Sequence, residues 1–138
     1  MKTKVLLATH GEMARGIQSA ISLIVGDVDL DIMCCYTEEN FSLEEASKTY
    51  LDSIDFENER LIVCTDLVGG SVNNEFFKHK QFYDFILISN VNLGLLIDLL
   101  LSGQTLEKED IQERCKSELL NVHYFDNIGE VAFLDADL

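Results

Sequence analysis

Apolar residues follow two spacings along the chain, one typical of strands and one typical of helices. Four mostly apolar runs have the length and pattern of strands, at residues 5–9, 30–36, 61–65 and 85–88. The first of them is continuous, as expected for a strand buried on both faces. Elsewhere apolar residues recur every three or four positions, which predicts amphipathic helices at about residues 13–26, 42–54, 71–80, 92–103 and 105–120. We expect the last helix to be continuous, with four residues facing inward: Leu106, Ile111, Cys115 and Leu119.

Short polar residues mark the predicted helix starts. Ser42 and Glu45 have the spacing of a capping box, in which each side chain binds a free backbone N–H at the helix start. Either Ser71 or Asn73 could cap the next helix, and either Asn90 or Asn92 the one after it.

Four strand–helix units in series predict an α/β fold, with a mainly parallel sheet covered by helices on both faces. We expect a flavodoxin-like open sheet of strand order 2-1-3-4 in one domain, residues 1–138. The tail, residues 121–138, has an ambiguous pattern, and residues 122–125 or 131–134 could add a fifth strand. The proposed order places the first and third strands side by side, so the residues that end them should meet.

Charge and composition exclude several classes of protein. The net charge of −15 and the lack of a Lys/Arg cluster argue against binding to nucleic acid and against binding to an anionic membrane surface. No apolar stretch has transmembrane length, and the N-terminus lacks the features of a signal peptide, so we expect a cytoplasmic protein. The cysteines have no metal-site spacing, and those in predicted strands should be buried thiols: Cys34, Cys35 and Cys64.

His10 is the first candidate for chemistry. It ends the first predicted strand, where ligands bind in open parallel sheets, and it is followed by Gly11 and a helix. A neutral imidazole is a nucleophile, and a helix N-terminus offers free N–H groups to an anion. These features suggest a phosphoryl-accepting histidine, while a polar residue that merely closes a strand explains this segment equally well.

Asp66 and the loop after it form the second candidate. Asp66 ends the third strand and could fix the tautomer of His10, while Gly69 and Gly70 would let the loop approach a phosphoryl group. The Ser71 hydroxyl could donate to that group. Taken alone, the loop is better explained as an ordinary turn with a helix cap, and Asp66 as a solvated carboxylate is also common. The pairing of His10 with Asp66 and a glycine-rich loop on the neighbouring strand favours the functional interpretation.

Three motifs together resemble the mannose family of enzyme IIA components of the bacterial phosphoenolpyruvate-dependent sugar phosphotransferase system (PTS). They occur in order over roughly residues 3–120: Thr9-His10-Gly11, Asp66-x-x-Gly69-Gly70-Ser71-x-Asn73 and Asn90-Val91-Asn92-Leu93. The resemblance implies a phosphocarrier that accepts a phosphoryl group from the protein HPr on His10 and passes it to the IIB component. IIB would then phosphorylate sugar carried by the membrane components IIC and IID.

The resemblance also implies roles for individual residues. His10 would attack through Nε2, with Asp66 holding the Nδ1 proton, and the phosphoryl group would be bound by Ser71 and the backbone near the three glycines. Thr9 and Asn73 would line the cleft. No metal or other cofactor is implied. The family's homodimers exchange a C-terminal strand, which residues 121–138 could supply.

Some positions depart from the family pattern, and other functions stay open. Leu67 and Val68 replace a frequent aromatic residue, and Val72 and Gly94 replace frequent prolines. Alternatives are the related phosphocarrier of dihydroxyacetone kinase, a PTS-related regulatory domain, and a non-covalent flavodoxin-like binding module. The transported sugar cannot be told from the sequence.

We expect two other histidines and one arginine to have surface or structural roles. His79 lies between Lys78 and Lys80, and we expect it to be solvated. His123, in the tail, should have a structural role. Arg15 should form a surface salt bridge rather than bind a phosphoryl group.

Overall fold

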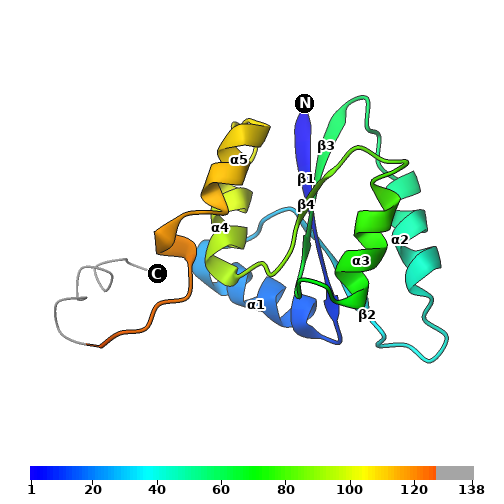
Figure 1. Cartoon of the computed structure of the whole chain (residues 1–138), viewed down its shortest axis with the longest axis horizontal. Helices are drawn as coiled ribbons and strands as arrows, with labels where there is room; N and C mark the ends of the chain where they lie inside the picture. Colours follow the sequence, from blue (N-terminus) through cyan, green and yellow to red (C-terminus); the bar gives the residue numbers. More distant parts are fainter. Residues whose placement is uncertain (127–138) are drawn as a thin grey trace.

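The computed structural model describes residues 1–126 and shows strands and helices in alternation (Figure 1). Its elements in chain order are β1 (Lys2–His10), α1 (Met13–Val25), β2 (Leu30–Cys35), α2 (Leu43–Asp52), β3 (Glu59–Thr65), α3 (Ser71–His79), β4 (Ile86–Ile88), α4 (Leu93–Ser102), α5 (Lys108–Arg114) and a short 3-10 helix, η1 (Glu118–Leu120).

The four strands form one parallel sheet of order β2-β1-β3-β4. This confirms the predicted α/β fold and its strand order. β1 and β3 are the central strands, paired from Lys2 opposite Glu59 to Ala8 opposite Thr65. Their carboxyl ends therefore lie next to each other at one edge of the sheet.

Side chains of the central strands alternate between two cores, one on each face of the sheet. Val5 and Leu7 of β1 pack in the core with α1, α4 and α5, whereas Leu6 and Ala8 pack in the core with α2 and α3. Figure 1 shows the two groups of helices on opposite sides of the strands. Burial on both faces explains why these strands are continuous apolar runs in the sequence.

Two of the predicted helix caps are confirmed. Ser42 Oγ accepts a hydrogen bond from the Glu45 N–H over 3.2 Å at the start of α2. Asn92 Oδ1 accepts from the Leu95 N–H over 2.8 Å, so Asn92, not Asn90, begins α4.

The predicted continuous helix over residues 105–120 is wrong. Glu107 and Asp110 form a capping box that starts α5 at Lys108, and the helix ends at Arg114. Ile111 is buried, but Cys115 is exposed and Leu119 is 64% exposed. With so little apolar surface packed inward, nothing holds the later residues in the same helix.

The tail forms no strand within the part that the structure describes. Residues 122–125 lack regular structure, and Val122 is 98% exposed, so this segment adds no fifth strand to the sheet of its own chain. The other expected strand, residues 131–134, lies outside the described residues.

His79 is buried, contrary to the expectation of a solvated side chain. Its side chain is 10% exposed and lies between α2 and α3, with Nε2 2.9 Å from Ser47 Oγ. The flanking lysines suggested solvent, yet His79 shares the inward face of α3 with Val72 and Phe76. The buried thiols expected in strands are present at Cys35 and Cys64, while Cys34 is half-buried.

Candidate active site

The ends of β1 and β3 bring His10 and Asp66 into direct contact. The His10 backbone N–H donates to Asp66 Oδ2 over 2.9 Å, and His10 Nδ1 lies 2.9 Å from the same oxygen. A carboxylate only accepts hydrogen bonds, so the neutral ring carries its proton on Nδ1 and has its lone pair on Nε2. The two residues that strand order was predicted to join are therefore arranged as a nucleophile and its orienting group.

Asp66 is held in its charged form. Its side chain is 7% exposed, and burial alone would raise its pKa. Hydrogen bonds from the His10 backbone and ring outweigh burial and hold the pKa of Asp66 below its usual value. The carboxylate can thus stabilise positive charge on the ring. The His10 side chain, by contrast, is 41% exposed and open to a reactant.

The loop after β3 approaches the His10 ring closely. Gly69 has a positive φ of 76°, a conformation that favours glycine. A Cβ at Gly70 would lie 3.2 Å from Leu67 Cβ and 3.5 Å from His10 Cε1. The lack of a side chain at Gly70 therefore lets the start of α3 lie beside the imidazole.

Ser71 faces His10 instead of capping α3. The N-cap residue is Gly70, and no side chain caps this helix in the described chain, so the prediction of a cap by Ser71 or Asn73 is wrong. Ser71 Oγ lies 3.3 Å from His10 Nε2. The N–H groups of the first turn of α3 stay open to an anion beside Nε2.

Two of the predicted amide donors are already occupied. The Gly11 N–H donates to Cys35 O over 2.8 Å, and the Gly70 N–H donates to Leu67 O over 3.2 Å. Gly11 has a positive φ of 59° and links the end of β1 to the end of β2. These two glycines shape the backbone around His10, and their own N–H groups are engaged within the protein.

The two residues expected to line the cleft support it from behind. Thr9 is fully buried, and its Oγ1 accepts a hydrogen bond from the Ala14 N–H in α1. Asn73 is half-buried, and its Oδ1 accepts from Thr65 Oγ1 over 2.8 Å. Thr9 thus ties β1 to α1, and Asn73 ties α3 to β3.

Tyr36 belongs to the site and was missed by the sequence reasoning. It directly follows β2, its hydroxyl lies 2.8 Å from Ser71 Oγ, and its ring centroid lies 5.6 Å from that of His10. The sequence shows only an aromatic residue at the end of an apolar run. Its adjacency to the first strand, given by the order 2-1-3-4, was the one available signal.

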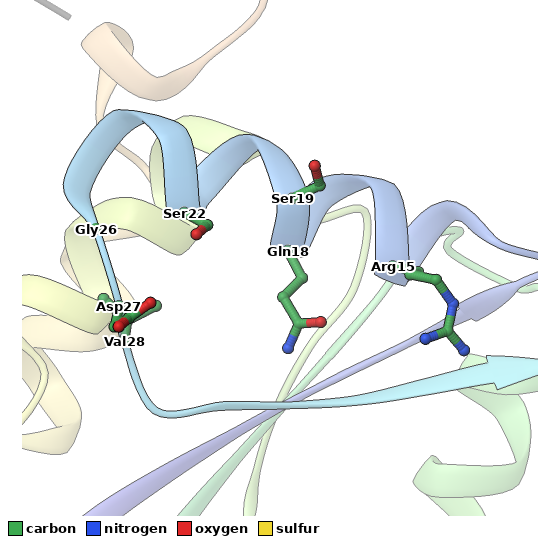
Figure 2. Close-up of a pocket in the computed structure, with 7 residues that line it drawn as sticks. All are labelled: Arg15, Gln18, Ser19, Ser22, Gly26, Asp27 and Val28. Atoms are coloured by element: carbon green, nitrogen blue, oxygen red, sulfur yellow. The ribbon is translucent and has the colours of Figure 1, made fainter.

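A hollow away from His10 lies beside α1 and the start of β2. It encloses about 340 Å³, and Figure 2 shows Arg15 and Gln18 extending from α1 toward β2. Gln18 Nε2 donates to Leu30 O, and Arg15 forms the expected surface salt bridge, 2.9 Å from Glu12. These polar groups serve the protein itself, so the hollow is a weaker candidate than the His10 site.

Residues 1–126 contain no group of three or more His, Cys, Asp or Glu side chains arranged to hold a metal ion. Within the same residues, every helix is too short or too polar to span a bilayer.

A family model and a solved structure place this chain in the same protein family. The family model described as "PTS system fructose IIA component" (EIIA-man) matches residues 4–116. A Klebsiella pneumoniae protein, described as a phosphoenolpyruvate-dependent sugar PTS permease, is 34% identical, with a TM-score of 0.81 over 90% of this chain and 91% of its own. No curated protein sequence matches significantly.

More distant solved structures share the fold. The mannose/sorbose-specific IIA subunit from Enterococcus faecalis is 24% identical, with a TM-score of 0.66 over 84% of this chain and 86% of its own. The PTS IIA protein associated with the fucose utilization operon of Streptococcus pneumoniae is also 24% identical, with a TM-score of 0.71 over 88% and 93%.

Proposed function

This chain belongs to the mannose family of PTS IIA components, which are phosphocarriers in sugar uptake, and we propose that His10 is the residue that carries its phosphoryl group. The observation that supports this assignment is that the two nitrogens of the His10 ring have different partners. Asp66 binds Nδ1, and Nε2 faces the Ser71 hydroxyl. An imidazole held in this way is a nucleophile with a fixed tautomer.

In the proposed transfer, His10 is the nucleophile and a donor phosphohistidine supplies the phosphoryl group. The lone pair of His10 Nε2 attacks phosphorus of a donor phosphohistidine, and the donor nitrogen keeps the electron pair of the broken P–N bond. The Nδ1 proton stays on His10, so the ring becomes positively charged beside the Asp66 carboxylate. Ser71 and the free N–H groups at the start of α3 bind the phosphoryl oxygens. The positive φ angles of Gly11 and Gly69, together with the lack of a side chain at Gly70, shape the backbone around His10.

We further propose the partners that the family uses. HPr would be the donor and IIB the acceptor, acting with the membrane components IIC and IID in the cytoplasm. Exposed apolar side chains lie on the segments beside His10 and would contact these partners: Met13 at 46% exposure, Leu67 at 55% and Val68 at 75%. The net charge of −15 favours a partner with a basic face. A homodimer formed through residues 121–138 stays part of this proposal.

Intact mass after incubation with phosphoenolpyruvate, enzyme I and HPr tests the assignment. We expect one acid-labile phosphoryl group on the wild type and none on His10→Ala. His123→Gln, which removes a histidine far along the sequence from the site, should still be phosphorylated. A His10→Ala variant that accepts the group as fast as the wild type would overturn the role of His10.

A further inference from the structure

Tyr36 has an unusual backbone conformation for an aromatic residue. Its φ is 65°, in the left-handed region, which bulky residues rarely adopt. Such conformations cluster at functional sites, where the surrounding structure imposes them. Here the turn follows the bond from the Gly11 N–H to Cys35 O and directs the Tyr36 side chain to Ser71 and His10.

The ring of Tyr36 is held between two other rings. Its centroid lies 5.6 Å from that of His10 and 5.3 Å from that of Phe41, the latter in an edge-to-face arrangement. A phenylalanine could make both contacts. The hydroxyl is therefore the part of Tyr36 that needs a separate explanation.

Proton counting fixes the direction of the hydrogen bonds. Asp66 holds the proton on His10 Nδ1, so Nε2 can only accept. Ser71, 3.3 Å away, must then donate its single proton to Nε2, and its oxygen accepts from the Tyr36 hydroxyl over 2.8 Å. The order of donation is Tyr36 to Ser71 to His10.

We propose that Tyr36 is a positioning residue for phosphoryl transfer at His10 and that it acts through Ser71, an inference that rests on the proposed function. By occupying the Ser71 oxygen, Tyr36 points the Ser71 proton at Nε2. When a phosphoryl group is bonded to Nε2, the same proton faces a phosphoryl oxygen. Tyr36 itself forms and breaks no covalent bond.

The test compares Tyr36→Phe with the wild type, with Ser71→Ala and with the double variant. One lost hydrogen bond of ordinary strength predicts that the rate constant of phosphoryl transfer at saturating phospho-HPr falls about fivefold, with an unchanged KM for phospho-HPr. In the Ser71→Ala background, Tyr36→Phe should change nothing. Tyr124→Phe, at a tyrosine that is 85% exposed in the tail, is the matched control.

A second readout does not depend on phosphorylation. The ¹⁵N chemical shift of His10 Nε2 should move in Tyr36→Phe and stay fixed in Tyr124→Phe, while both variants keep the wild-type urea midpoint. An unmoved shift would overturn the hydrogen-bond chain. A normal transfer rate in Tyr36→Phe, or an equal loss in the Ser71→Ala background, would overturn the positioning role. A wild type that accepts no phosphoryl group on His10 would instead overturn the proposed function.

Discussion

Two histidines of this chain, His10 and His79, each lie beside a serine and a carboxylate, yet these partners contact different nitrogens of the two rings. At His10 the carboxylate binds Nδ1 and the serine faces Nε2. At His79 both partners lie at Nε2, with Ser47 Oγ at 2.9 Å and Glu75 Oε1 at 3.4 Å. The same three residue types therefore leave His10 Nε2 facing the Ser71 hydroxyl, whereas at His79 the serine and the carboxylate both lie at Nε2.

The positions in the fold reinforce this difference. His10 lies at the carboxyl edge of the sheet with its side chain 41% exposed, whereas the His79 side chain is 10% exposed between two helices. Ser47 is fully buried, so no substrate reaches that hydroxyl without opening the helix pair. The two clusters therefore differ in which nitrogen the carboxylate contacts and in access from solvent, although they contain the same residue types.

Exchanging the two carboxylates for amides should give the largest contrast. Asp66→Asn should slow phosphoryl transfer by about 100-fold, because the ring loses the charge that fixes its tautomer and stabilises its cation. Glu75→Gln should leave the transfer rate unchanged. Rapid-quench measurement of transfer from phospho-HPr checks both variants. Similar losses in the two would show that the His79 cluster also takes part in transfer.

The two histidines should differ in the opposite sense when stability is measured: replacing His79 should destabilise the fold more than replacing His10. His79→Ala should lower the free energy of unfolding by about 2 kcal/mol, since it leaves a cavity between α2 and α3 and removes the buried hydrogen bond between His79 and Ser47. His10→Ala, at a partly exposed position, should lower it by about 1 kcal/mol or less. Urea unfolding checks this prediction, and His79→Ala should still accept a phosphoryl group wherever it is folded.

The smallest expected effect is the pH dependence of stability that comes from Asp66. Its pKa is lower in the folded protein than in the unfolded chain, so the unfolded state binds more protons as the pH falls. The stabilisation is complete above the unfolded pKa of about 4 and is lost as the pH falls through the lower folded value. The difference in unfolding free energy between the wild type and Asp66→Asn should therefore narrow below about pH 4. A difference that stays constant down to the acid transition would contradict the lowered pKa.

Most of the fold was predictable because the strand pattern, the helix pattern and their order along the chain all indicate the same α/β fold. Continuous apolar runs and helical spacing give four strand–helix units, and the order 2-1-3-4 then places His10 beside Asp66. The failure at α5 has a local cause. Its amphipathic pattern continues past Arg114, but tertiary packing holds Ile111 and leaves Leu119 in solvent.

The site was harder to predict wherever geometry depends on a single backbone angle. Nothing in the residue types shows that Tyr36 adopts a φ of 65° and reaches Ser71. His79 is different, because its helical spacing from Val72 and Phe76 was visible and the lysines on either side outweighed it. The Gly11 N–H is bonded to Cys35 O because of the register between the ends of β1 and β2. A sequence motif does not show that register, so it could not predict this bond.

The shared oxygen of Asp66 has a consequence for conformational entropy. The His10 backbone N–H holds the same Asp66 oxygen that binds the His10 ring. The imidazole therefore cannot turn about the Cα–Cβ bond of His10 without breaking its own contact to a carboxylate that the backbone keeps in place. The rotational freedom of the imidazole is lost when the chain folds rather than when the donor arrives. Freezing such a side chain typically costs about 1 kcal/mol, so the same freezing during transfer would slow each encounter about fivefold.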